Sequence, residues 1–156
     1  MKELGTEWEV DPVQKVEMVV DSLHVALMDY ERVMILKEKD GDRYLPISVS
    51  ALSANAIVVH LREQPLPNPP YDFVLSIINA LDAALKEVIV HNLEKGIFKA
   101  KAILSHGNET FEIPCNPGDA IAMALRTKSP IFVTESILAK AGVKVDEMTR
   151  LTRGHK

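Results

Sequence analysis

The chain has 156 residues, of which 47% are hydrophobic and 26% charged, as expected for one globular domain that buries its own core. Its net charge of −4 and pI near 5.7 disfavour nucleic acid as the main partner, because an acidic protein repels a polyanion. A single cysteine excludes an internal disulfide, no apolar run is long enough to cross a membrane, and the start is polar and acidic, so we expect a cytoplasmic protein.

The first half of the chain shows the alternation that is typical of β-strands. Apolar residues alternate over 16–27 with one slip near Asp21, and this pattern predicts a long strand with a bulge. Residues 32–37 and 43–49 are also strand-like, and Asp40-Gly41 between them predicts a tight hairpin turn. A hairpin is therefore expected directly after the long strand.

The period changes to that of a helix after residue 50. Apolar residues at three- and four-residue spacings predict a helix over 50–62. A stiff, proline-rich connector follows, because proline lacks an amide hydrogen and fixes φ. Beyond it, an apolar stripe from Phe73 to Leu85 predicts a second helix, with Asp72 at its start.

A meander and two more helices complete the predicted fold. Three strands with short, glycine-bearing links are expected at 87–93, 97–104 and 109–113. After them come a helix, a short strand and a last helix, within 114–126, 130–133 and 135–141. The order predicts a single compact α+β domain with a mainly antiparallel sheet and about four helices. We assign 1–12 to an N-terminal extension, 13–142 to the domain and 143–156 to a C-terminal tail.

The stretch 114–126, PCNPGDAIAMALR, carries the residues that matter most for function. Asn116 is a good helix N-cap, Pro117 suits the first helical position, and Asp119 falls in the first turn near the positive end of the helix dipole. Capping alone accounts for all three residues. On the functional interpretation, the Asp119 carboxylate binds a divalent metal for phosphodiester hydrolysis.

A metal site needs more than one carboxylate or a bound phosphate, so Asp119 needs a partner. Asp72, Glu112 and Asp82 are the candidate acids, and Asp72 stands at the other marked helix start. Arg126 can hold a phosphate, although its charge also complements a helix C-terminus. Phosphate-binding loops, zinc-binding spacings and nucleophile elbows are absent from the sequence.

Four segments together resemble the bifunctional nuclease domain family in order and spacing. They are Leu45–Ile57 (LPISVSALSANAI), the helix with Asp72, Leu93–Leu104 (LEKGIFKAKAIL) and Pro114–Val133 (PCNPGDAIAMALRTKSPIFV). The resemblance covers roughly residues 13 to 140. It implies a compact α+β domain, a homodimer and, for some members, degradation of both RNA and DNA.

Several positions depart from the family's pattern. Asp119 and Arg126 match it, and so does Asp72. The pattern's tryptophan, glutamate, histidine, arginine and serine are replaced here by Ser48, Ser53, Tyr71, Asn116 and Gly118. The departures bear on the chemistry more than on the fold.

Two functional hypotheses follow. The resemblance implies a nuclease assisted by Mg²⁺ or Mn²⁺ that acts on RNA, DNA or both, with Asp119 and Asp72 as metal ligands or base and Arg126 as phosphate holder. The alternative is a non-catalytic homodimeric interaction or ligand-binding module with the same fold. The acidic net charge and the replaced polar residues favour the alternative.

Overall fold

An eight-stranded sheet with four helices makes up the part of the chain that the computed structural model describes, namely residues 14–26, 28–62, 69–144 and 146. The strands are β1 Lys15–Val25, β2 Arg32–Glu38, β3 Arg43–Val49, β4 Ala83–Glu94, β5 Ile97–His106, β6 Glu109–Cys115, β7 Ile131–Thr134 and β8 Val143–Lys144. The helices are α2 Ala51–Leu61, α3 Pro69–Ala80, α4 Pro117–Thr127 and α5 Glu135–Ala141. The predicted α+β class is confirmed.

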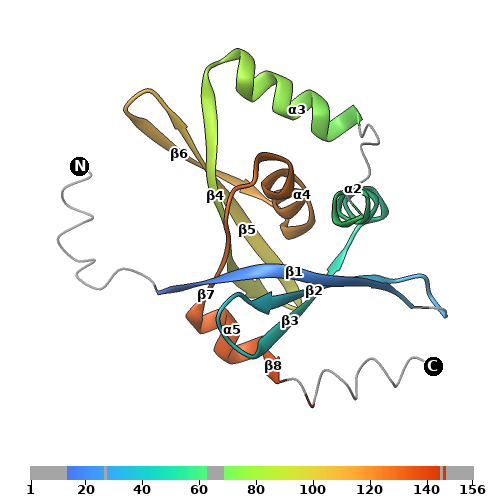
Figure 1. Cartoon of the computed structure of the whole chain (residues 1–156). Helices are drawn as coiled ribbons and strands as arrows, with labels where there is room; N and C mark the ends of the chain where they lie inside the picture. Colours follow the sequence, from blue (N-terminus) through green and yellow to red (C-terminus); the bar gives the residue numbers. More distant parts are fainter. Residues whose placement is uncertain (1–13, 27, 63–68, 145, 147–156) are drawn as a thin grey trace.

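The sheet has the order β6-β5-β4-β7-β1-β2-β3-β8. Its neighbours pair antiparallel except β4 and β7, which run parallel, so the sheet is mainly antiparallel as predicted. Figure 1 shows α2, α3 and α4 grouped above β1, with α5 on its other side next to β3. This arrangement brings α3 and α4 over the β4–β6 meander, where the candidate site lies.

The predicted strand bulge and hairpin are both present. The register of β1 against β2 shifts between Val20 and Ser22, at the slip in the apolar alternation. The β2–β3 hairpin is confirmed, but neither residue of Asp40-Gly41 has a positive φ. The Glu38 side chain instead folds over Gly41, where a Cβ would lie within 3.0 Å of the carboxylate.

The second predicted helix ends earlier than its apolar stripe suggests. Helix α3 stops at Ala80, and the chain turns at Asp82 with a φ of 55°. Ala84 and Leu85, which the stripe included, belong to β4 and pair with Ser105 and Leu104 of β5. Tertiary strand pairing therefore decides the state of a segment whose apolar spacing suits a helix equally well.

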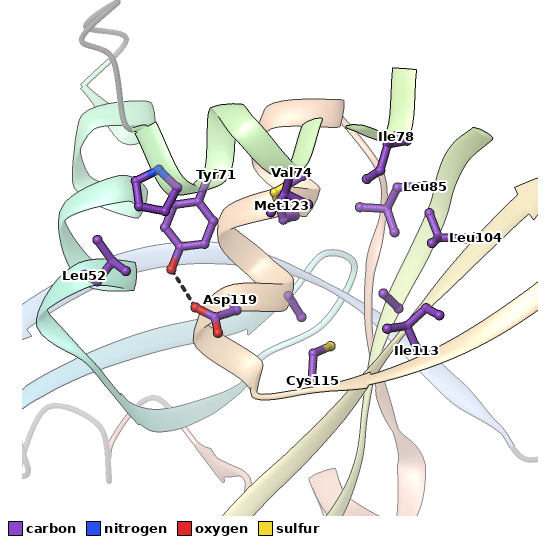
Figure 2. A pocket seen from close by; sticks show the side chains of 13 residues that line it. Leu52, Tyr71, Val74, Ile78, Leu85, Leu104, Ile113, Cys115, Asp119 and Met123 are labelled. Atoms are coloured by element: carbon purple, nitrogen blue, oxygen red, sulfur yellow. Dashed lines mark hydrogen bonds between the residues drawn. The ribbon is translucent and has the colours of Figure 1, made fainter. Parts of the chain in front are cut away.

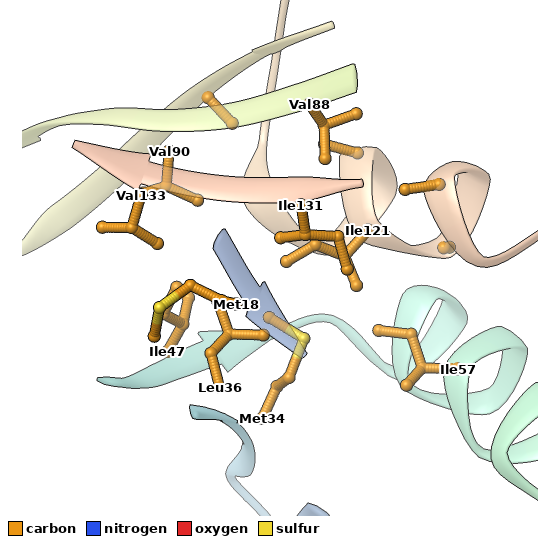
Figure 3. Close-up of a cluster of buried hydrophobic side chains, with 14 of the residues drawn as sticks. Met18, Met34, Leu36, Ile47, Ile57, Val88, Val90, Ile121, Ile131 and Val133 are labelled. Atoms are coloured by element: carbon orange, nitrogen blue, oxygen red, sulfur yellow. The ribbon is translucent and has the colours of Figure 1, made fainter. Parts of the chain in front are cut away.

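The core lies between the sheet and the helices, and α4 contributes most of its own length to it. Ala120, Ile121, Ala122 and Ala124 of α4 are buried, and the small alanines allow the helix to approach its neighbours closely. Figure 3 shows strand and helix side chains meeting in this core. They include Met18, Met34, Leu36, Ile47, Ile57, Val88, Val90, Ile121, Ile131 and Val133.

The sheet continues past the predicted end of the domain. Strand β8 lies just beyond residue 142 and pairs with β3 through Arg43 and Tyr44. The predicted N-terminal extension, residues 1–12, lies outside the described residues. Within the described ranges, every helix is too short or too polar to cross a bilayer.

Candidate functional site

Helix α4 begins with the cap that the sequence predicts. Asn116 is the N-cap, and its Oδ1 accepts a hydrogen bond of 2.8 Å from the Asp119 backbone amide. Its Nδ2 donates to Asp119 Oδ2, also at 2.8 Å. Both the main chain and the side chain of Asp119 are therefore tied to the cap, which orients the carboxylate at the helix start.

Tyr71 of α3 is the residue that sequence reasoning missed. Its hydroxyl donates to Asp119 Oδ1 at 2.6 Å, and the side chain is 4% exposed. The bond joins the first turns of two helices that are far apart in the sequence. The sequence marks this position only as the tyrosine before Asp72 that replaces the histidine of the family's pattern.

Asp72, the neighbour of Tyr71, contacts the other end of α4. Arg126 Nε donates to Asp72 Oδ1 at 3.2 Å, and the Arg126 side chain is 11% exposed. The guanidinium carbon also lies 5.6 Å from the centroid of the Tyr71 ring, at the distance of a cation–π contact. Tyr71 therefore contacts both predicted α4 residues, and Asp72 contacts Arg126.

The predicted site residues are brought to one helix face but not to one point. Asp119 and Arg126 are seven positions apart in α4, so they share a face at a separation of about 10 Å along the axis. Asp72 contacts Arg126 at the far end, while Asp119 contacts Tyr71 and Asn116 at the near end. The other candidate acids are engaged elsewhere: Glu112 pairs with Lys101, and Asp82 lies in the turn before β4.

Helix α2 packs against the start of α4 so closely that only glycine fits at position 118. A Cβ at Gly118 would lie within 3.0 Å of Ser53 Oγ. Ser53 is 1% exposed, and its hydroxyl bonds to the N-cap residue of α2, Ser50, at 2.9 Å. The contact fixes the start of α4, and with it Asp119, against α2.

An apolar cavity of about 350 Å³ opens beside Asp119. Figure 2 shows Tyr71 and Asp119 at one end of it and aliphatic side chains at the other. Those aliphatic residues come from α3 and from the meander and include Ile78, Leu85, Leu104 and Ile113. The cavity thus combines a hydrophobic interior with one carboxylate.

Two neutral acids flank that carboxylate. Burial, together with the hydrogen bond to Asp119, raises the pKa of Tyr71 far above its usual value, so the hydroxyl keeps its proton. Burial and the negative charge of Asp119 raise the pKa of the Cys115 thiol to about 11. Cys115 is therefore a neutral wall residue at physiological pH and a poor nucleophile.

Metal binding at this site would depend on Asp119 and on groups that the substrate and water supply. Among the described residues, no group of three or more His, Cys, Asp or Glu side chains is placed to hold a metal ion. Mg²⁺ commonly keeps several waters and takes one or two carboxylates plus substrate phosphates, so Asp119 alone fits such a role. Ligation by Asp119 and Asp72 together stays a prediction.

A family model and several relatives of this chain point to the same protein family. The model of the bifunctional nuclease domain matches residues 34–146. An uncharacterized protein from Mycobacterium tuberculosis is 34% identical over 132 residues, which cover 84% of this chain and 79% of that protein. Bifunctional nuclease 1 of Oryza sativa subsp. japonica is 31% identical over 121 residues, which cover 74% of this chain and 37% of the rice protein.

Proposed function

This chain belongs to the bifunctional nuclease domain family, and from that membership we propose that it cleaves phosphodiester bonds in RNA, DNA or both. Relatives at 31% identity are named bifunctional nuclease, and the nuclease role comes to this chain by that likeness. The arrangement of the Asp119 carboxylate supports the proposal from the structure.

The observation that carries the proposal is the orientation of Asp119. Its two carboxylate oxygens accept hydrogen bonds from two different donors, Tyr71 Oη and Asn116 Nδ2. A carboxylate held in this way costs little reorganisation when it accepts a proton from an attacking water. Asp119 is also partly exposed and lines the cavity, so water and substrate can reach it.

A divalent cation, Mg²⁺ or Mn²⁺, is part of the proposal. When bound, such an ion supplies Lewis-acid stabilisation of the phosphoryl oxygens. Asp119 would hold it from the protein side, while Asp72 holds Arg126 at the other end of the shared helix face. Arg126 would contact a substrate phosphate, for which its planar guanidinium is suited.

A second candidate function, a homodimeric interaction module, is favoured by the outer surface of α3. Phe73, Val74, Ile77 and the following Leu81 are between 41% and 67% exposed, although all are apolar. The edge strand β6, which lines the same cavity as α3, also exposes Phe111 and Ile113. Exposed apolar surface of this kind is typical of a protein interface. Ile77→Lys is expected to convert a dimer to a monomer in light scattering.

Cleavage by the purified full chain tests the proposed function. Single-stranded RNA and single-stranded DNA of one sequence are incubated with Mg²⁺, with Mn²⁺ and with EDTA. The proposal expects products with either metal and none with EDTA. Intact substrate under all metal conditions, from protein that is folded by circular dichroism, would leave the interaction module as the better account.

A further inference from the structure

We propose that the cavity between α3, α4 and the β4–β6 meander binds a small ligand with an apolar body and a protonated amine, whose ammonium group contacts Asp119. The inference goes beyond the proposed nuclease activity, because it rests on the composition of the cavity wall and not on cleavage. It adds a ligand site that shares one carboxylate with the proposed site.

The walls select the apolar body of the ligand. Ile78 and Met123 line the cavity from the helices, and Leu85, Leu104 and Ile113 line it from the meander. A volume of about 350 Å³ lies near the lower end of the range for small-molecule sites. A chain of a few methylenes fits that size, and burial of each methylene favours binding.

The polar end selects the head group. Asp119 is the only charged residue on the cavity wall within the described part of the chain. Its oxygens each accept one hydrogen bond, from Tyr71 and from Asn116, and a carboxylate oxygen has a further lone pair. An ammonium group is complementary to this end, whereas a carboxylate or phosphate head would be repelled.

Among the described residues, Tyr71 and Cys115 are the other polar side chains of the cavity wall, and they offer a hydroxyl and a thiol. Arg126 lies against the Tyr71 ring, but it is paired with Asp72 and does not line the cavity. Asp119 is therefore the charged group that meets the ligand.

A homologous series of amines tests the proposal on the wild-type chain. Butylamine, hexylamine and octylamine are compared with octanoate and 1-octanol by NMR of the methionine methyl groups. Met123 lines the cavity, whereas Met28 is 95% exposed and serves as the internal reference. We expect Met123 to shift and Met28 to stay, with about fourfold tighter binding for each added methylene. Octylamine should bind at least about tenfold tighter than octanoate.

Two variants separate the head from the body of the ligand. Asp119→Asn should make octylamine and 1-octanol bind alike while the chain-length dependence stays. Ala102→Phe fills the cavity from β5 and should abolish binding of the whole series, while Ala80→Phe, on the exposed end of α3, should change nothing. If Ala102→Phe fails to fold, the proposal is tested by the amine series on the wild-type chain and by Asp119→Asn.

Three results would overturn the proposal. Octanoate could bind as tightly as octylamine, or affinity could be independent of chain length. Met123 could also shift with protein concentration alone, which would mean that a second copy of the chain fills the cavity. A ligand that binds as proposed should also inhibit any cleavage, but the binding result stands whether or not cleavage is found.

Discussion

Tyr71 donates a hydrogen bond of 2.6 Å to Asp119 across 48 positions of sequence. The bond connects α3 to α4 and ends on the carboxylate that is proposed to act on the substrate. The Tyr71 ring also lies beneath the Arg126 guanidinium. One buried side chain thus positions two of the three residues in the proposed site.

Tyr71→Phe tests this positioning role. The ring and its contact with Arg126 remain, and only the hydroxyl is lost. We expect the free energy of unfolding to fall by about 1–2 kcal/mol, because a hydrogen bond to a charged group is removed. Cleavage should fall about tenfold or more, with little change in KM.

The split between kcat and KM separates positioning from a loss of stability. Both constants are measured well below the melting temperature of the variant, where it is folded, and only kcat should fall. Tyr44→Phe, a change of the same kind in β3, is the control and should leave both constants unchanged. A folded Tyr71→Phe variant with the wild-type kcat would contradict the positioning role.

Gly118→Ala tests the close approach of α2 and α4. The new methyl group would collide with Ser53 Oγ, and we expect a loss of about 1–3 kcal/mol in the free energy of unfolding. Ser53→Ala should recover part of that loss in the double variant, because the hydroxyl oxygen is the nearest atom. Thermal unfolding of the four members of the cycle measures the coupling, and strict additivity would argue against the contact.

The sequence predicted the α4 cap well, because its signals are local. Asn116, Pro117 and Asp119 interact within one turn, and their spacing is enough to define the contacts. The bond between Tyr71 and Asp119 could not be predicted in this way. It depends on how α3 packs against α4, and neither apolar period nor spacing carries that information.

The positions that depart from the family's pattern form a cluster that only the three-dimensional structure shows. Ser53, Tyr71, Asn116 and Gly118 are scattered in the sequence but lie together around the start of α4.

The end of α3 could not be predicted from local signals, since the apolar residues around the start of β4 suit a helix or a strand. Pairing with β5 decides it, and that pairing is not local.

The ion pair of Glu38 and Arg43 predicts how stability changes in acid. The Arg43 hydrogen bonds hold the pKa of Glu38 below its usual value of 4.5. A depressed carboxyl pKa stabilises the folded state above about pH 4.5, and this contribution is lost as the pH falls through the folded pKa. Arg43→Met should therefore cost about 2 kcal/mol at pH 7 and less at pH 3.

Urea unfolding at the two pH values measures that difference. Glu38→Gln should remove part of the acid dependence, since Arg43 also pairs with Glu135, whose pKa it lowers as well. Lys39→Met, which breaks an exposed pair with Glu17, is the control and should have little effect at either pH. An Arg43→Met penalty that is equal at pH 7 and pH 3 would refute the linkage.

The raised pKa of Cys115 predicts that the folded state loses stability in alkali. Its folded pKa of about 11 is raised above its usual value of 9.0 by burial and by Asp119. A raised pKa stabilises the folded state below about pH 9, and the contribution is lost as the pH rises towards 11. Cys115→Val should weaken this alkaline decline in urea unfolding. A decline of unchanged size would show that other groups, such as Tyr71, cause it.

The most direct test of the proposed nuclease compares Asp119→Asn with Asp42→Asn. Asparagine at position 119 keeps an oxygen for Tyr71 and loses the charge, while Asp42 lies in an exposed surface pair. Cleavage of single-stranded RNA and DNA is measured with Mg²⁺ and Mn²⁺, alongside the melting temperature of each variant. We expect Asp119→Asn to stay folded and lose at least about a hundredfold in rate, as expected for a removed catalytic carboxylate, while Asp42→Asn cleaves like the wild type. Wild-type cleavage by a folded Asp119→Asn variant would contradict the account.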